Sequence, residues 1–488
     1  MSGSEAFGGG RPAASGSLAR FSPGSQVRKE GETGSASRRE RADKLPFLVT
    51  VYLFSLILPF IFQLGPLRMS AYRFILIVLI VPLLAMWLSG RAGRIRFADI
   101  AFLLSSLWVG VSYTVLHGPA AGLEPGGIAL IETMGAFLLA RVYVRSLEHF
   151  YKVIKTLFLL VLFLLPFAVI ETVTGQDIAL KLSNSIFKSN YPIYMDPRWG
   201  LRRVQAVFQH PIAFGVFCSS IIGCTFYVIG YKRSAFKKLI YTSTVVFTAG
   251  LSLSSGPMTA MATQLGLISW DRILRKFKMR WYFLSGMFLS FVVLITIFAN
   301  RSPAQILISF VAFRPSSAYN RLKIWDWGTI NVARHPLFGV GYNEWERGRS
   351  MPESIDMFWL QPAIINGLPC AVFLHLAFLS VILLVIFNKS MGERYDSYRT
   401  GFLISMIGLY ISGWTVHYWN NVYVLFVFLL GCGFCFVGNK ASEYNDSELS
   451  GAVDTGNSAQ PKDTDVAGGE TNEPVSPYSR QKVRHTRT

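Results

Sequence analysis

Arginines that stand beside aromatic residues are the side chains of this 488-residue chain best suited to chemistry. Arg202 and Arg203 are adjacent in the stretch RWGLRRVQ, just before the apolar run that opens at His210-Pro211. Guanidinium groups bind phosphate oxygens in bidentate pairs and stay charged at any working pH. We therefore predict an anion site here, able to neutralise a diphosphate leaving group as its bond to a sugar breaks.

A second arginine-rich segment spans 312–345 and reads AFRPSSAYNRLKIWDWGTINVARHPLFGVGYNEW. Its spacing predicts a helix that Ser316 or Ser317 caps and that His335-Pro336 ends, before a tight turn. One face of this helix carries Leu322, Trp325, Thr329 and Val332. We expect that face to lie along the membrane surface, with Arg321 near the membrane boundary.

Each of these residues also has an ordinary structural interpretation. A loop arginine more often contacts solvent or lipid headgroups than a ligand, and His210-Pro211 and His335-Pro336 are more often turns than acid/base groups. The tryptophans near the predicted boundaries are first of all interfacial anchors: Trp199, Trp325, Trp327 and Trp359. Ionisable residues in or near apolar runs are functional suspects: Glu132, Glu171 and His375. A functional role is favoured because arginines and aromatic residues are concentrated together in two separate segments, about 174–206 and 300–357.

The composition indicates that membrane-spanning segments position these residues. Hydrophobic residues make up 51% of the chain and charged residues only 15%, against about 25% in a soluble domain. Windows of roughly 20 apolar residues, the length that crosses a bilayer, recur along the chain. We predict twelve spans, at about 45–64, 70–89, 97–117, 126–145, 151–173, 207–230, 239–255, 257–271, 281–299, 366–387, 401–416 and 421–438.

Basic residues predict the orientation. Lys and Arg concentrate in five loops on one side, whereas the alternate short loops carry only Arg68. The positive-inside rule then places both tails, 1–44 and 439–488, in the cytoplasm. Their composition predicts disorder. Two long loops, about 174–206 and 300–357, fall on the far side, the second between the ninth and tenth spans.

Other functional classes find no support in the sequence. The net charge of +19 lies almost wholly outside the tails, in the loops that orient the spans, so nucleic acid is not an expected partner. No Walker-type loop, H-E-x-x-H or G-x-S-x-G motif is present. ATP-driven transport and metalloproteolysis are therefore not indicated.

The order and spacing of three stretches resemble a known family. RRVQAVFQHPIAFG, RLKIW…RHPLFGVG and SIDMFWL…NGLP, with the far-side loop before the tenth span, resemble the O-antigen ligase/polymerase superfamily of bacterial inner membranes. The resemblance covers about 200–387. It implies an all-α, GT-C-like glycosyltransferase domain over 45–438 that needs no metal or cofactor. Its reaction moves a glycan from an undecaprenyl-diphosphate donor to an acceptor at the periplasmic face, with inversion.

The resemblance also assigns residues. Arg203, with Arg202 as the alternative register, and Arg321 stand where the family holds the donor diphosphate, and His210, His335, Trp325 and Trp359 lie in the matching motifs as possible site-lining residues. Gly367 is eleven positions after Asp356, so Asp356 stands where the family's ligases carry a histidine. This carboxylate is either a base for the attacking hydroxyl or an exposed loop acid. Gly256 replaces an arginine that many members carry after paired serines.

The resulting hypothesis is an inner-membrane polymerase of exopolysaccharide or O-antigen repeat units. Its expected partners are the undecaprenyl-diphosphate-linked oligosaccharide, a glycan acceptor, the bilayer and polysaccharide assembly or export proteins. The alternatives are a ligase to lipid A-core, a flippase or other transporter of lipid-linked glycans, and a scaffold of a secretion complex.

Overall fold

The computed structural model describes residues 45–64, 67–300, 302, 305–306, 308–309 and 315–437. The predicted tails lie outside these residues, as do Arg301 and Arg314 of the second long loop. All of the described residues belong to one compact unit.

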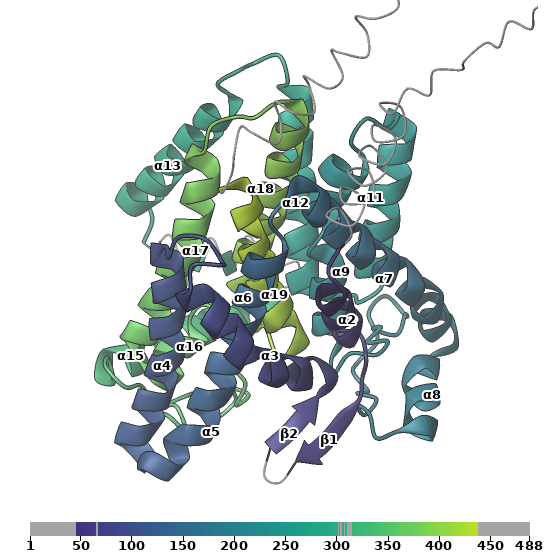
Figure 1. Ribbon diagram of the computed structural model, residues 1–488. Helices are drawn as coiled ribbons and strands as arrows, with labels where there is room; N and C mark the ends of the chain where they lie inside the picture. The colour runs from purple at the N-terminus through teal and green to yellow at the C-terminus, as the bar shows by residue number, and fades with distance from the viewer. Residues whose placement is uncertain are drawn as a thin grey trace, which may run out of the picture. The chain divides into compact units, whose positions relative to one another are not determined.

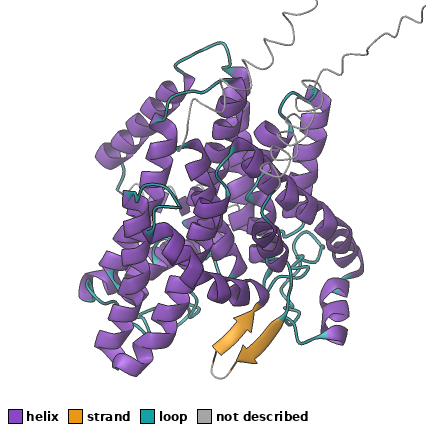
Figure 2. Cartoon of the chain, in the orientation of Figure 1, coloured by secondary structure: helices purple, strands orange, loops and turns teal. Residues whose placement is uncertain are grey.

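The chain is mostly helical (Figures 1 and 2). In the first half the helices are α2 (Phe47–Ser55), α3 (Ala71–Leu88), α4 (Phe97–His117), α5 (Pro119–Leu130), the π-helix η1 (Ile131–Gly135), α6 (Ala136–Tyr143), α7 (Leu147–Thr174), α8 (Ile178–Ile186), α9 (Pro211–Ser219), α10 (Ile222–Cys224) and the π-helix η2 (Thr225–Ile229). In the second half they are α11 (Ala235–Gly250), α12 (Ser255–Ile273), α13 (Arg280–Phe298), α15 (Pro315–Arg334), α16 (Gln361–Asn366), α17 (Leu368–Phe387), α18 (Glu393–Gly413), α19 (Asn421–Cys432) and the 3₁₀-helix η3 (Gly433–Phe436).

Seven helical segments of the described chain are long and apolar enough to cross a membrane. They are Ala71–Leu88, Phe97–His117, Pro119–Tyr143, Leu147–Thr174, Pro211–Ile229, Arg280–Phe298 and Leu368–Phe387. Each of the twelve predicted windows overlaps a helix, but α2, α11, α12, α18 and α19 fall short of this standard in length or hydropathy. The arrangement is compatible with an all-α membrane protein.

The window 45–64 differs from the prediction of a single span. Helix α2 has nine residues, or about 14 Å at 1.5 Å per residue, and the chain then forms strand β1 (Ile61–Leu64). β1 pairs with β2 (Leu67–Ser70) in an antiparallel hairpin whose register joins Ile61 to Ser70 (orange in Figure 2). The Ile61 N–H also donates to the Lys188 carbonyl at 3.1 Å, which ties the hairpin to the first long loop.

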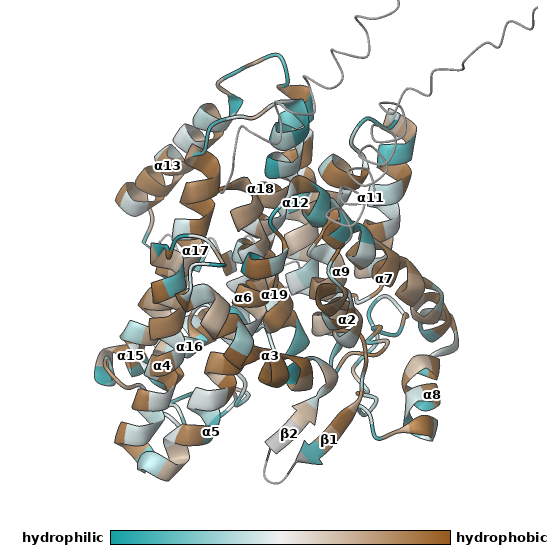
Figure 3. Ribbon diagram, viewed as in Figure 1, coloured by the Kyte–Doolittle hydropathy of each residue, from teal (hydrophilic) through white to brown (hydrophobic). Residues whose placement is uncertain are grey.

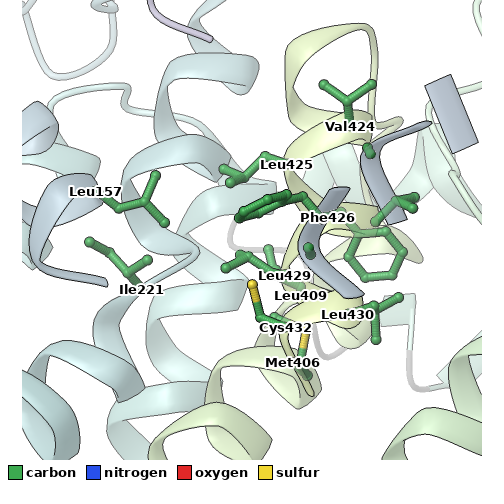
Figure 4. Close-up of a cluster of buried hydrophobic side chains, with 14 of the residues drawn as sticks. Leu157, Ile221, Met406, Leu409, Val424, Leu425, Phe426, Leu429, Leu430 and Cys432 are labelled. Atoms are coloured by element: carbon green, nitrogen blue, oxygen red, sulfur yellow. The ribbon is translucent and has the colours of Figure 1, made fainter. Parts of the chain in front are cut away.

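The core lies around α19, which packs most extensively against α6 and also against α9. Figure 4 shows Leu157, Ile221, Met406 and Leu409 pointing toward the side chains of α19. Nearly every residue of α19 is buried, as expected for a helix surrounded by other helices. By contrast, α13 is largely apolar (Figure 3). None of its side chains is buried, which suits a helix surrounded by lipid.

The second long loop contains the predicted helix, with two differences. Helix α15 ends at Arg334, immediately before His335-Pro336, as predicted. It begins at Pro315, so the predicted serine caps lie inside its first turn. Its apolar face does not lie free on a membrane surface. Leu322, Trp325 and Val332 pack against a second buried cluster that includes Trp345, Met357 and Leu360.

Candidate functional site: an arginine cluster on adjacent serines

Three arginines from distant parts of the chain converge on the turn before α12. Arg198 donates through Nη1 to the Leu253 carbonyl at 2.6 Å, and Arg203 donates through Nη2 to Ser254 Oγ at 2.9 Å. Arg321 of α15 donates through Nη2 to Ser255 Oγ at 2.8 Å. Successive Cα atoms are about 3.8 Å apart, so the three arginines bind one short stretch of the chain, residues 253–255. We call these three residues the arginine cluster.

The turn that receives the arginines has a constrained backbone. Leu253 has a backbone φ of +46°, a value that residues other than glycine rarely adopt. The Ser254 hydroxyl donates to the Ser252 carbonyl at 2.9 Å, so its oxygen lone pairs stay available to Arg203. Strain of this kind persists where the surrounding structure holds it, often at functional sites.

Glu171 holds the strand that carries Arg203. Its Oε1 accepts the Gln205 N–H at 3.0 Å and its Oε2 accepts the Ala206 N–H at 2.9 Å. Ala206 has a φ of +48°, and the Gln205 side chain bonds three backbone groups nearby. The acid near the end of α7 therefore positions the backbone beside the arginine cluster.

Arg202 lies outside the cluster. It forms an ion pair with Asp177, donates to the Gly175 carbonyl and lies over the Tyr194 ring at 4.8 Å. Its charge is thus already neutralised by a carboxylate. Of the two registers that the sequence allows, the structure brings Arg203, and not Arg202, to Arg321.

Arg321 is buried, with 7% of its surface exposed. Its Nε donates to the Thr415 carbonyl at 2.7 Å, while its Nη1 meets no acceptor among the described residues. Burial lowers the pKa of Arg321 to about 10, with a further lowering by the Arg198 charge and an opposing effect of Asp356. The side chain is therefore still charged at neutral pH, and one of its N–H groups is available to a ligand.

Asp356 is near enough to Arg321 for each to shift the pKa of the other. Burial raises the pKa of Asp356, against the lowering effects of Arg321 and of a hydrogen bond from Ser354. The Phe358 N–H donates to the Val416 carbonyl at 3.0 Å, so the segment that carries Asp356 runs beside the Thr415 carbonyl that holds Arg321. Asp356, whose pKa is raised, and the buried Arg321 are therefore both held at the place where these two segments run side by side.

The two histidines of the matching motifs have different environments. His210 caps α9, because its Nδ1 accepts the Ile212 N–H at 3.0 Å. Burial and the nearby charge of Arg203 lower the pKa of His210 to about 4, so the ring is neutral at pH 7. His335 is exposed just beyond α15, and it makes none of the described contacts with the arginine cluster.

The two tryptophans are packing residues. Trp359 is buried and donates through Nε1 to the Tyr410 carbonyl at 2.8 Å. Trp325 lies edge-on to Trp414 at 6.1 Å. Neither contacts the arginines directly in the described structure.

Gly256 leaves no room for the arginine that the resemblance would place there. A Cβ at this position would lie 2.1 Å from Val416 Cγ1. The carbonyl of Gly256 accepts a bond from Ser412 at 3.1 Å, which packs α12 tightly against α18. In this chain Arg203 and Arg321 provide the positive charge beside the serines.

Comparisons with known proteins do not name a family. No model of a known protein family matches the chain, and no curated protein matches it. The family resemblance therefore remains a prediction from the quoted motifs.

Sequence reasoning did not identify the parts that assemble the cluster. The Ser254-Ser255 pair lies between two of the predicted spans, and its role depends on the two arginines that reach it. Arg198 was visible only as a neighbour of the adjacent arginines. The pairing of half-buried Arg202 with Asp177 could not be predicted, because the two residues are far apart in the sequence and meet only in the folded chain.

Proposed function

We propose that this chain is a bacterial inner-membrane glycosyltransferase that polymerises undecaprenyl-diphosphate-linked repeat units at the periplasmic face. The observation that carries the proposal is the arginine cluster, in which Arg203 and Arg321 meet on adjacent hydroxyls. Neutral hydroxyl and carbonyl groups orient a guanidinium without cancelling its charge. A diphosphate is the ligand that two such groups suit best.

The proposed reaction uses the cluster and the nearby acid. The acceptor hydroxyl attacks the anomeric carbon of the donor sugar and gives its proton to the Asp356 carboxylate. The bond between that carbon and the diphosphate oxygen breaks, and its electron pair leaves with undecaprenyl diphosphate. Arg203 and Arg321 neutralise the charge that develops on the leaving group. Attack from the face opposite the diphosphate inverts the anomeric centre.

The proposal also includes the topology. In it the chain crosses the membrane twelve times in a GT-C-like arrangement, with both tails in the cytoplasm. The long loops then lie on the periplasmic side, and each contributes an arginine of the cluster. α8 and α15, from the two loops, lie toward the same end in Figure 1, which supports this placement.

Polymerase is preferred to ligase because of Asp356. The family's ligases carry a histidine at the matching position, and here a carboxylate with a raised pKa takes that place. A carboxylate that is less acidic than usual is a stronger base for a sugar hydroxyl.

The test is a synthesis assay with purified protein in lipid nanodiscs. Undecaprenyl-diphosphate oligosaccharide from the source cells is supplied with and without EDTA, and the products are sized by gel and mass spectrometry. A ladder of repeat-unit multiples, unchanged by EDTA, is the expected result. Transfer only on addition of lipid A-core would identify a ligase, and no new glycosidic bond with an intact donor would refute the glycosyltransferase.

The assay has a matched control on the same helix. Arg334 of α15 is exposed and pairs with Glu346, so Arg334→Met removes an arginine outside the cluster. Arg321→Met is expected to abolish the ladder, and Arg334→Met to leave it intact. A normal ladder from folded Arg321→Met protein would overturn the mechanism.

A further inference from the structure

A second site lies beside the arginine cluster, in a polar cavity of about 410 Å³. Its walls come from α3, α4, α5, η1, α16, α17, α19, the segment before α16 and the turn between α18 and α19. This volume is within the ~300–1,000 Å³ range of small-molecule sites. We call it the polar cavity.

Two buried polar atoms at the wall of the cavity have no partner among the described residues. They are Nδ2 of Asn366, a residue only 6% exposed, and Nδ1 of His417. Unsatisfied buried polar groups are costly, so native proteins rarely keep them without a ligand or water. Burial lowers the pKa of His417 to about 3, so its ring is neutral. The two side chains thus offer an amide donor and a neutral imidazole nitrogen.

The charges that face the cavity compensate each other. Arg73 Nη2 lies 2.7 Å from Glu132 Oε1, and the Tyr72 hydroxyl donates to the same oxygen at 3.3 Å. Glu132 belongs to the π-helix η1, an irregularity that is frequent at functional sites. Because the arginine is paired with a carboxylate, the cavity favours a neutral polar ligand over an anion.

Aromatic side chains complete the lining. Tyr113 and Phe358 lie in the wall, and Trp419 is 37% exposed. Amide and hydroxyl groups interleaved with aromatic faces match a sugar, whose hydroxyls both donate and accept and whose C–H faces are apolar.

Two chain segments contribute both to the cavity and to the surroundings of the arginine cluster. Phe358 and His417 line the cavity, and the same segments carry Asp356 and the Thr415 carbonyl that receives Arg321. The Phe358 N–H and the Val416 carbonyl join these segments at 3.0 Å. A sugar in the cavity would therefore lie against the segment that carries the proposed base.

We propose that the polar cavity binds a neutral sugar unit of the acceptor glycan. This inference rests on the proposed function and adds the acceptor to it. The arginine cluster holds the diphosphate of the donor, and the cavity holds the glycan whose hydroxyl attacks. The two sites thus recognise opposite chemistries, a charged phosphate and an uncharged polyol.

The test measures the two ligands separately in nanodiscs by isothermal titration calorimetry. The first probe is the repeat-unit oligosaccharide released from its lipid by mild acid, and the second is undecaprenyl diphosphate. Asn366→Leu and His417→Phe keep the side-chain size but remove the unpaired polar atoms. Each is expected to weaken oligosaccharide binding about tenfold or more and to leave undecaprenyl diphosphate binding unchanged.

Two controls keep the result decisive. Ser220→Ala removes a buried hydroxyl outside the cavity and the arginine cluster, where it bonds the Phe217 carbonyl at 2.7 Å, so it is expected to change neither affinity. Arg321→Met is expected to weaken undecaprenyl diphosphate binding alone. Should Asn366→Leu fail to fold, His417→Phe and Trp419→Ala test the same prediction.

The outcomes separate this inference from the proposed function. Unchanged oligosaccharide binding in folded Asn366→Leu and His417→Phe proteins would overturn the acceptor site, even with product formation intact. Oligosaccharide binding lost in Arg321→Met, or abolished by salt, would also overturn it, because the sugar would then occupy the arginine cluster. Absence of both undecaprenyl diphosphate binding and product would instead refute the proposed function.

Discussion

Two neighbouring regions of this protein each contain a buried or half-buried arginine, and they differ in its partner. In the arginine cluster, Arg321 is held by the Ser255 hydroxyl and the Thr415 carbonyl. In the polar cavity, Arg73 is held by the Glu132 carboxylate. Neutral acceptors leave the positive charge available to an anion, whereas a carboxylate neutralises it. The partner, more than the residue type, therefore decides which ligand each region can bind.

The same contrast recurs elsewhere in the chain. Arg141, buried between α4 and α6, lies 3.0 Å from Asp99, and Arg202 pairs with Asp177. Removing one member of a buried ion pair leaves the other charge uncompensated. We expect these arginines to stabilise the fold, and Arg321 to serve the reaction at a cost in stability.

Asp356→Asn is expected to have the largest effect on activity. Loss of a general base lowers turnover by about 10²–10⁴-fold. The same change removes a negative charge near Arg321, so undecaprenyl diphosphate should bind equally well or more tightly. Turnover in nanodiscs and calorimetric affinity measure the two effects. Normal turnover would show that Asp356 is only a loop acid.

Arg321→Met is expected to lower turnover by about 10²–10³-fold, the cost of losing one stabiliser of transition-state charge. Its melting temperature should fall less than that of Arg141→Met, because Arg321 is held by a hydroxyl and a carbonyl and forms no ion pair among the described residues, although Asp356 loses a nearby positive charge. Turnover and thermal unfolding in the same nanodiscs measure both. A large fall in melting temperature would place Arg321 with the structural arginines.

Arg141→Met is expected to lower stability and to leave turnover unchanged, the opposite of Arg321→Met. Leaving Asp99 buried without its cation should cost about 3–5 kcal/mol of stability. The protein that remains folded should keep its turnover per molecule. Thermal unfolding together with turnover of the folded fraction measures this, and an unchanged melting temperature would remove the contrast between the two kinds of arginine.

Ser255→Ala is expected to have an intermediate effect. A hydrogen bond to a charged group contributes about 1.5–3 kcal/mol, so turnover should fall roughly 10–100-fold as Arg321 loses its orientation. Ser220→Ala, which removes a buried hydroxyl outside both the cluster and the polar cavity, is the matched control. Equal turnover of the two variants would show that the serine does not position the arginine.

The smallest expected effect is on the pH profile. The base must be ionised, so activity should be lost as pH falls through the raised pKa of Asp356. The Arg321 charge lowers that pKa, and Arg321→Met should therefore move the acid limb of the residual activity to higher pH. A limb that stays in place would mean that the titrating group is not beside Arg321.

The sequence predicts the helices better than the contacts between them. Apolar runs near the length of a bilayer locate most helices, and His335-Pro336 correctly ends α15 because proline cannot continue a helix. The hairpin β1–β2 was missed because its apolar strands continue the run that begins with α2. The face of α15 was assigned to a membrane surface because periodicity shows that a face is apolar, but not what covers it.

The candidate site could be predicted only in part. Guanidinium chemistry points to Arg203 and Arg321 without any structure. The choice between Arg202 and Arg203 depends on Asp177, which lies in the first long loop and reaches Arg202 only in the folded chain. The sequence points to Glu132 as an ionisable residue near an apolar run, but it does not show that Glu132, Asn366 and His417 line one cavity, because they come from three separate parts of the chain.

The most direct test is a cryo-electron microscopy structure of the protein in nanodiscs with undecaprenyl diphosphate. The account predicts density for the two phosphates within hydrogen-bond distance of Arg203 and Arg321, with the arginines still on Ser254 and Ser255. Phosphate density beside Arg73, or at another group of arginines with the cluster empty, would contradict it.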